Sequence, residues 1–352
     1  MSRFLNENMS GLTPYTPGEQ PKSRENIIKL NTNENPYGPS PKALKAIHET
    51  DEEMLILYPD PDATELTKSI AAACGVRPEQ VMAGNGSDET LAFVFMGFGN
   101  HIYFPEISYG FYSVFASVFG CQFHAVPLKD DLSLDLDAFK GVDGTVVIAN
   151  PNAPTGLAVS RDEIEELLKA NRDHLVVIDE AYVDFGAESA APLIDRYDNL
   201  MISRTTSKSL GLAGLRVGWC MACKEVIDDM KKIKFSFNPY NIDRVAMAAA
   251  KEALDDREHF ADTCGRIMKT RGRTERELEE LGFRSTHSMT NFIFVEHEKM
   301  PGDVYFRKLR ERNILVRHFD TEKIKNYVRI TIGTDEQMDR LISETKEILK
   351  EI

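Results

Sequence analysis

The chain has 352 residues, of which 42% are hydrophobic and 28% are charged, and its formal net charge is −14 at pH 7. This length allows one large and one small domain with a substantial core. The acidic balance repels phosphate backbones, so we expect small-molecule substrates and no nucleic-acid partner. No apolar run approaches the length of a membrane span, so we expect no membrane partner either.

The five cysteines are an odd number spread along the chain. No apolar segment follows Met1-Ser2-Arg3, so we expect no secretory signal. The simplest account is a cytoplasmic protein with free thiols. Glu296-His297-Glu298 ends an apolar run and is interpreted as a solvated turn, so no metal site is expected.

The first forty residues are rich in Pro, Asn and Gly, and they predict an irregular N-terminal arm. A helix pattern begins at Pro41 (PKALKAIHET), and a second one follows in TELTKSIAAAC. Further on, short apolar runs alternate with helix patterns. The runs are TVVIA (145–149), LVVID (175–179) and LMIS (200–203).

Between the first two runs, Ser160-Arg-Asp-Glu163 is a capping box that predicts a helix start. Strands that are apolar on both faces and alternate with helices indicate an α/β fold. Its central sheet would be mostly parallel and covered by helices on both sides.

A long helical pattern covers about residues 244–281, and the sequence pattern of the last seventy residues then differs from that of the preceding region. They hold the apolar runs NFIFVE, ILVRHF and YVRITIG, which predict a smaller C-terminal α/β unit. We therefore divide the chain into an arm of residues 1–40, a large cofactor-binding domain of residues 41–248 and a small domain of residues 249–352.

Polar residues follow two of the predicted strands. Asn152 comes shortly after TVVIA, whereas Asp179 ends LVVID and is followed by Tyr182. Ligands of open parallel sheets bind beyond the carboxyl ends of the strands. Asn152 and Asp179 should therefore point into the same crevice.

A second group of residues suits an anion. Gly84-Asn85-Gly86-Ser87-Asp88-Glu89 precedes a helix pattern, and free backbone N–H groups at a helix start bind anions. Alone this signal is weak, because such sequences mostly cap helices. Thr205, Ser207 and Arg216 could close around the same anion through hydroxyl and guanidinium contacts.

Lys208 lies among these hydroxyl residues, and three glycines follow it closely in the sequence. A lysine, a phosphate cradle and a buried carboxylate together fit pyridoxal phosphate, whose aldehyde forms a Schiff base with a lysine. Asp179 would keep the ring nitrogen protonated, Asn152 and Tyr182 would bond the ring hydroxyl, and Tyr109 would supply an aromatic face. Taken singly, each of these residues could instead cap a helix or turn, pack in the core or lie on the surface. Their combined occurrence, in this order and at the strand ends, favours the cofactor.

The chain also carries a series of motifs. They are LTPYTPG, NENPYGPSP, YPDP, GNGSDE, NPNAPTG, VIDEAYVDF, PYN at 239–241, VRHF and VRITIG. With them the chain, from about Leu12 to its last helix, resembles the pyridoxal-phosphate aminotransferases of fold type I, and most closely the histidinol-phosphate aminotransferase family.

The resemblance implies a role for each matching position. Lys208 would be the Schiff-base lysine and proton shuttle, with Asp179 and Tyr182 as further catalytic groups. The phosphate would be bound by Ser87 and Asp88 through backbone N–H groups and by Thr205, Ser207 and Arg216. Tyr58 would reach the cofactor of a neighbouring subunit, which implies a homodimer. Tyr15, Arg317 and Arg329 would face the substrate.

The implied reaction is transamination of L-histidinol phosphate with 2-oxoglutarate or glutamate, in histidine biosynthesis. The alternatives on the same scaffold are a threonine-phosphate decarboxylase and an aromatic aminotransferase. A regulator would need a basic helix-turn-helix arm, which the first forty residues do not suggest. For Arg317 and Arg329, the plainer alternative is pairing with surface carboxylates.

Overall fold

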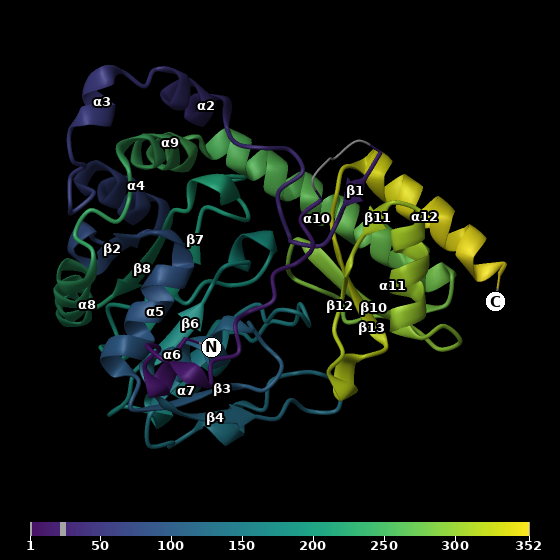
Figure 1. Cartoon of the computed structure of the whole chain (residues 1–352), viewed down its shortest axis with the longest axis horizontal. Coiled ribbons are helices and arrows are strands. Elements are labelled where there is room, and N and C mark those ends of the chain that lie inside the picture. Colours follow the sequence, from purple (N-terminus) through teal and green to yellow (C-terminus); the bar gives the residue numbers. More distant parts are fainter. Residues whose placement is uncertain (1, 22–25, 352) are drawn as a thin grey trace.

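Of the three β-sheets in the described residues, the two larger ones lie side by side along the long axis of the molecule, with helices packed around each (Figure 1). The structure is a computed structural model that describes residues 2–21 and 26–351. Residues 1 and 22–25 of the predicted arm, and residue 352, lie outside the described part.

The larger sheet has seven strands in the order β2-β8-β7-β6-β5-β3-β4. Its pairings are parallel from β7 to β4, and β8 runs antiparallel to both of its neighbours. The strands are β2 (Val81–Gly84), β3 (His101–Pro105), β4 (Gln122–Val126), β5 (Thr145–Ala149), β6 (Val176–Asp179), β7 (Leu200–Thr205) and β8 (Gly218–Ala222). The predicted mostly parallel sheet is confirmed.

Alternate residues of the central strands enter two different cores. Val146 and Ile148 of β5 pack into one cluster, whereas Val147 packs into another on the opposite face. Burying a side chain of this size contributes about 1.5–3 kcal/mol. One face is covered by α2 (Pro41–His48), α4 (Thr64–Cys74), α7 (Arg161–Ala170) and α9 (Arg244–Asp255), and the other by α5 (Gly86–Phe98), α6 (Phe111–Phe119) and α8 (Lys224–Phe237).

The smaller sheet is antiparallel, in the order β12-β13-β10-β9. Its strands are β9 (Phe283–Ser285), β10 (Phe292–His297), β12 (Arg317–His318) and β13 (Tyr327–Thr331), and its core is shared with α10 (Arg257–Glu280), α11 (Gly302–Glu311) and α12 (Asp335–Leu349). Ile293 and Ile330, which face each other across β10 and β13, are fully buried in this core. The smaller C-terminal α/β unit that the sequence predicted therefore contains a second sheet.

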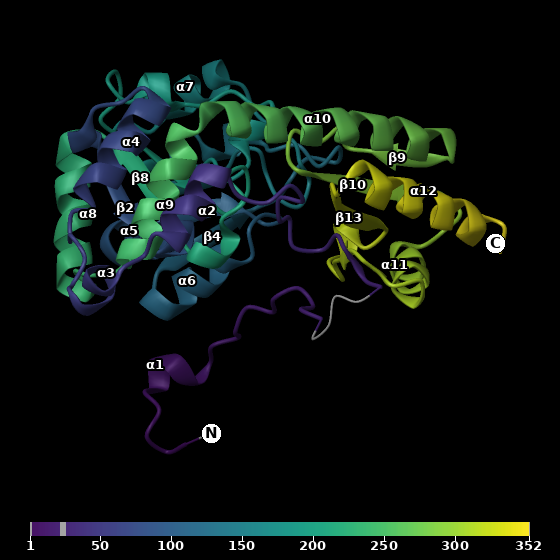
Figure 2. The ribbon, with the colours of Figure 1, turned by 90° about the horizontal axis from the view of Figure 1, so that it is seen from above.

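The described residues of the predicted arm contain two short regular elements. The first is α1 (Glu7–Ser10), whose ribbon stands apart from both sheets in Figure 2. The second is β1 (Ile28–Lys29), which pairs in parallel with β11 (Ile314–Leu315). Thr331 of β13 also donates its backbone N–H to the Leu30 carbonyl at 2.9 Å. The end of the arm is thereby attached to the smaller sheet.

The predicted helical stretch over residues 244–281 is helical but is not continuous. Two helices, α9 and α10, meet at Asp256, whose backbone leaves the helical region (φ −87°, ψ 68°). Its carboxylate accepts a hydrogen bond from Ser40 Oγ at 2.6 Å and pairs with Lys42 at 3.3 Å. This tertiary contact, more than 200 residues away in sequence, explains the break.

The predicted domain boundary after residue 248 falls within α9, and the division into domains stays a prediction. A short helix, α3 (Glu52–Ile56), was not predicted. In the described part of the chain, no helix combines the length and the apolar character that crossing a membrane requires.

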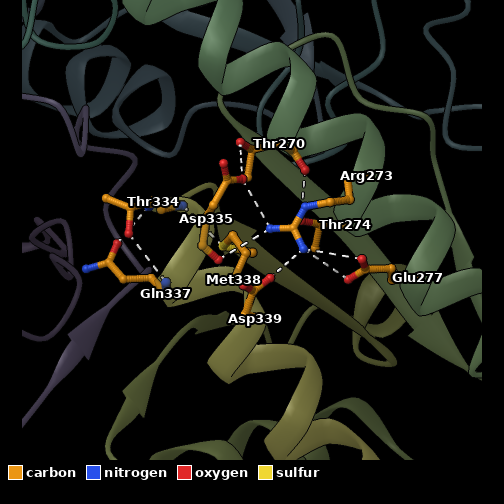
Figure 3. A network of polar contacts seen from close by, with 10 residues as sticks. Thr270, Arg273, Thr274, Glu277, Thr334, Asp335, Gln337, Met338 and Asp339 are labelled. Atoms are coloured by element: carbon orange, nitrogen blue, oxygen red, sulfur yellow. Dashed lines mark hydrogen bonds and ion pairs between the residues drawn. The ribbon is translucent and has the colours of Figure 1, made fainter.

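A polar network joins α10 to α12 beside the smaller sheet (Figure 3). Arg273 of α10 bonds Glu277 of its own helix at 3.2 Å and reaches Asp335 and Asp339 of α12 at 3.1 Å and 2.5 Å. Thr270 also donates to Asp335 at 2.8 Å. Single exposed ion pairs contribute little, but one guanidinium held by three carboxylates fixes the two helices relative to each other.

Candidate active site

The carboxyl ends of β5, β6 and β7 meet at one edge of the larger sheet. The register places Ala149 beside Asp179 and Asp179 beside Ser203. A pocket of ≈ 620 Å³, including its open mouth, lies beyond this edge. It is lined by Ser87, Asp88, Tyr109, Ala149, Ala153, Asp179, Ala181, Tyr182, Thr205, Ser207, Lys208 and Arg216. Most of the predicted cofactor-binding residues are thus brought together.

Asp179 is a buried carboxylate at the floor of this pocket. Its Oδ2 accepts a hydrogen bond from the Tyr112 hydroxyl at 2.9 Å, and its Oδ1 accepts from the backbone N–H of Ala181 at 3.2 Å. Burial raises the pKa of Asp179 to about 6, and the two hydrogen bonds oppose this shift. The carboxylate is therefore predominantly ionised at neutral pH.

Tyr112 is a site residue that the sequence analysis missed. It is fully buried in α6, within the apolar run FYSVFASVF, where a tyrosine is most simply interpreted as core. Only the fold shows that its hydroxyl reaches β6. Burial, together with the neighbouring Asp179, raises the pKa of Tyr112, so its hydroxyl stays a hydrogen-bond donor to Asp179.

The predicted anion cradle lies at the start of α5. This helix begins at Gly86 (φ +76°), so the N–H groups of Ser87 and Asp88 belong to its first turn and have no partner within the helix. Gly218 of β8 passes so close that a Cβ there would lie 2.3 Å from the Ser87 nitrogen. Only glycine fits at 218, because the strand backbone forms one wall of the cradle.

Hydroxyl groups and a guanidinium complete the cradle. Arg216 Nη1 lies 3.3 Å from Ser207 Oγ, and Thr205 Oγ1 donates to the same oxygen at 2.9 Å. Arg216 Nη2 pairs with the Asp88 carboxylate at 2.9 Å. The side chain of Asp88 thus orients Arg216, while its backbone lies in the helix start.

Lys208 lines the same pocket as Asp179. Its Nζ donates to the backbone carbonyl of Thr32 at 3.3 Å and lies 5.6 Å from the centre of the Tyr182 ring. The Tyr182 hydroxyl accepts a hydrogen bond from Asn33 Nδ2 at 2.8 Å. Asn33, which belongs to NTNEN and was not singled out from the sequence, is therefore a neighbour of the site.

Tyr109 and Asn152 differ in how they meet the pocket. Tyr109 lines it, and its hydroxyl donates to Asp88 Oδ1 at 2.7 Å. Asn152 is buried behind the lining, with its amide donating to Ile107 O at 3.0 Å and Thr155 Oγ1 at 3.1 Å. Its predicted contact with a cofactor ring stays a prediction.

Arg317 and Arg329 are direct partners across the antiparallel strands β12 and β13, so their side chains share one face of the smaller sheet. Among the described residues, neither forms an ion pair with a carboxylate. Each donates to a backbone carbonyl at 3.2 Å, Arg317 to Thr16 and Arg329 to Asn31.

Arg329 is half-buried, and its buried Nε has no hydrogen-bond partner among the described residues. Burial, with a smaller contribution from Arg317, lowers the pKa of Arg329. Two unneutralised guanidinium groups on one face would be stabilised by an anion. The alternative that both arginines pair with surface carboxylates is not what the structure shows.

The remaining predicted residues lie at the rim or outside. Tyr15, carried by the arm, stacks on Phe111 with ring centres 4.4 Å apart and lies 6.3 Å from the Tyr109 ring. Tyr58 is 76% exposed and stacks on Tyr240 at 4.6 Å, outside the pocket of its own chain.

The fold and this pocket define a class of protein. The profile of the aminotransferase class I and II family matches residues 25–344, and the chain belongs to that family.

Within it, the chain belongs to the histidinol-phosphate aminotransferases. It is 46% identical to the histidinol-phosphate aminotransferase of Brachyspira hyodysenteriae over 99% of this chain and 100% of the relative. It is 49% identical to histidinol-phosphate aminotransferase 1 of Bordetella parapertussis over 99% of each chain. The crystal structure of the Sinorhizobium meliloti enzyme, in complex with pyridoxal-5'-phosphate, has a TM-score of 0.89 at 24% identity and covers 100% of this chain and 99% of its own. That likeness shows the shared fold.

Proposed function

We propose that this protein transfers an amino group between L-histidinol phosphate and the 2-oxoglutarate/glutamate pair, with pyridoxal phosphate as cofactor, as a step of histidine biosynthesis. The observation that carries the proposal is one pocket in which Lys208 and the buried Asp179 lie beside an anion cradle. The close relatives named above support the choice of substrate.

The residues present fit the cofactor. The cradle, where Gly218 allows the backbone to approach Ser87, suits a phosphate, and the buried carboxylate of Asp179 suits a protonated ring nitrogen. Tyr109 would lie against the ring, and Asn152 and Tyr182 would bond the ring oxygen. When bound, the cofactor supplies an aldehyde carbon and an electron-withdrawing ring.

Lys208 supplies the amine at this site and then moves a proton. With the cofactor bound, Lys208 would act as general base toward the α-carbon proton of the substrate and as general acid toward C4′. Asp179, ionised at neutral pH, would hold a proton on the ring nitrogen. Arg216 and the first turn of α5 would hold the phosphate end in place.

The paired arginines would bind the substrate anions. Arg329 is half-buried, its Nε has no hydrogen-bond partner in the described residues, and Arg317 is directly across the strand pair. The carboxylate of glutamate and the phosphate of histidinol phosphate would occupy this position in alternate half-reactions. Tyr15, on the arm, would contact only the longer phosphate substrate.

Arg329→Lys should impair both half-reactions. Lysine keeps the charge but loses the planar fork that binds an anion through two hydrogen bonds. A charge-assisted contact of about 1.5–3 kcal/mol corresponds to a decrease in kcat/KM of roughly 10–150-fold. Each half-reaction is measured separately through the absorbance of the bound cofactor.

Tyr15→Phe is the matched comparison for that experiment. It removes one hydroxyl at the rim and should lower kcat/KM for histidinol phosphate more than for glutamate. Equal losses for the two substrates would contradict the assignment of Tyr15 to the phosphate substrate. An unchanged rate with glutamate in Arg329→Lys would contradict the shared anion position.

We further propose a homodimer as the working unit. Exposed apolar residues adjoin Tyr58, which suits a partner surface. Leu55 (70%), Ile56 (70%) and Leu57 (48%) precede Tyr58 (76%) in the sequence, and Tyr240 (44%) stacks on it. A second copy that covered these residues would bring Tyr58 toward its own pocket.

Mixing two inactive variants should test the shared site. Tyr58→Phe and Lys208→Ala homodimers each lack one required residue at both sites. Heterodimers formed after mild unfolding and refolding of the mixture should regain activity, because one of their two sites keeps both wild-type residues. If every site lay within one subunit, mixing would restore nothing beyond the sum of the two variants.

The division into a cofactor-binding domain of residues 41–248 and a small domain of residues 249–352 remains our proposal, as does a cytoplasmic location. All five cysteines are free, which suits a reducing compartment.

A substrate panel tests the proposed reaction. Purified protein supplied with pyridoxal phosphate is offered L-histidinol phosphate, phenylalanine and threonine phosphate, with 2-oxoglutarate as acceptor. We expect the highest kcat/KM with histidinol phosphate and formation of glutamate. Release of carbon dioxide from threonine phosphate, without glutamate formation, would instead support a decarboxylase.

A further inference from the structure

Residues 31–35 (NTNEN), here called the 31–35 segment, lie between the two sheets and contact both sides of the candidate site. Each of four residues of this segment bonds a group on or next to a candidate site residue. The contacts are Asn31 O with Arg329 Nη2 (3.2 Å), Thr32 O with Lys208 Nζ (3.3 Å), Asn33 Nδ2 with the Tyr182 hydroxyl (2.8 Å) and Asn35 Nδ2 with Ser209 O (3.0 Å).

Asn33, at the centre of this segment, has an unusual backbone. Its φ is +59°, in the left-handed region, and it is 1% exposed. Asparagine tolerates this region better than most residues, yet the conformation persists only where surrounding contacts hold it. Its carbonyl accepts from Asn291 Nδ2 at 2.9 Å, and its N–H donates to Thr331 Oγ1 at 3.0 Å.

The orientation of the Asn33 amide follows from Thr331. The Thr331 oxygen accepts the Asn33 backbone N–H, so its own proton is free to be donated to Asn33 Oδ1, 3.0 Å away. With Oδ1 facing Thr331, Nδ2 must face the Tyr182 hydroxyl and act as the donor. The phenol proton of Tyr182 is then directed elsewhere, and Tyr182 lines the pocket.

We propose that Asn33 is a positioning residue that holds Tyr182 as a hydrogen-bond donor into the pocket and ties it to β13, the strand of Arg329. The inference rests on the proposed function, because the acceptor of the Tyr182 proton would be the ring oxygen of the cofactor. A donor that itself accepts a hydrogen bond donates more strongly, since such bonds polarise one another.

Asn33→Gly should weaken this donation without straining the backbone, because glycine adopts a positive φ freely. A donor to the ring oxygen stabilises its anionic form, so a weaker donor lets the cofactor keep its proton to higher pH. We expect the midpoint of the pH-dependent absorbance of the bound cofactor to rise by about half a unit or more, and kcat to fall about tenfold. An unchanged midpoint would overturn the proposal.

A double-variant cycle separates positioning from a general structural effect. Tyr182→Phe should raise the midpoint by itself, and adding Asn33→Gly should raise it no further. An equal rise in both backgrounds would show that Asn33 acts without Tyr182 and would overturn the proposal. Asn313→Gly, at an exposed left-handed asparagine (φ +60°) on the connection before β11, is the matched control and should leave the midpoint unchanged.

A second pair of variants keeps the test valid if Asn33→Gly does not fold. Thr331→Val removes the hydroxyl that orients the amide and should raise the midpoint, whereas Thr331→Ser keeps the hydroxyl and should restore it. Equal midpoints for valine and serine would overturn the proposal. A wild-type protein that binds the cofactor but does not transaminate histidinol phosphate would refute the proposed reaction, while the absorbance titration would still test Asn33.

Discussion

Lys208→Ala should lose transamination by at least about a thousandfold, since positioned proton transfer alone contributes about 10²–10⁴-fold. Lys208 Nζ lines the pocket, and in the described residues it forms no ion pair with a carboxylate; its hydrogen bond goes to the Thr32 carbonyl. The variant should keep its fold, because the side chain anchors no core. The rate is measured in single turnovers with cofactor added in excess.

The covalent link itself can be located. Reduction of the wild-type holoenzyme with borohydride, followed by peptide mapping, should place the cofactor label on Lys208. Lys169→Ala, at an exposed lysine that pairs with Glu165 and Glu166 in α7, is the control and should keep both label and activity. A label on another lysine, or substantial turnover by Lys208→Ala, would refute the assignment.

Asp179→Asn should lower turnover by roughly a thousandfold, which is about 4 kcal/mol of transition-state stabilisation. An amide cannot hold a proton on the ring nitrogen, so the ring would no longer withdraw electrons. The fold should survive, because an asparagine oxygen can still accept the Tyr112 hydroxyl at 2.9 Å. Unchanged turnover with unchanged cofactor content would contradict the role.

The same variant should stabilise the cofactor-free protein at neutral pH. Burial raises the pKa of Asp179 to about 6, above its unfolded value of about 3.9. Between these two values the native state binds more protons than the unfolded state, so stability falls as pH rises from about 4 to about 6. Above pH 6 the carboxylate is ionised in both states, and its burial then lowers the free energy of unfolding by about 3 kcal/mol for a pKa shift of about two units.

A neutral asparagine at position 179 avoids the destabilisation that comes from burying an ionised carboxylate. Urea unfolding of the cofactor-free proteins should therefore show Asp179→Asn to be more stable than wild type at pH 7.5, with the difference shrinking toward pH 4.5. Asp143→Asn, at an exposed aspartate, supplies the comparison for a surface carboxylate. A wild-type protein that was the more stable at pH 7.5 would show that the carboxylate is not destabilised by burial.

The parts of the fold that local pattern controls were predictable. Val146, Val147 and Ile148 had to be buried on both faces, and a doubly buried strand implies a covered parallel sheet. The capping box at Ser160 and Glu163 forms as its spacing predicts. That Asp179 and Lys208 share one pocket could be predicted from the positions of the strand ends, without information about distant contacts.

What the sequence did not reveal depends on contacts between distant segments. The break at Asp256 is stabilised by Ser40, and the helical periodicity of the sequence does not indicate that the helix breaks there. Tyr112 looks like a core residue until β6 places Asp179 beside it. Asn33 is separated by 149 positions from the tyrosine that it bonds. Such pairs become visible only when the chain is folded.

The contact at Asp256 also limits how the two sheets can move. The chain leaves the smaller sheet after the 31–35 segment and enters α2 at Ser40 and Pro41, and it returns at Asp256, where α10 begins (Figure 1). One carboxylate joins these two crossings through Ser40 and Lys42. A single carboxylate therefore holds two segments, more than 200 positions apart in the sequence, at the same point. Arg317 and Arg329 belong to the smaller sheet and Lys208 follows a strand of the larger one, so this contact helps to fix the separation between the two halves of the candidate site.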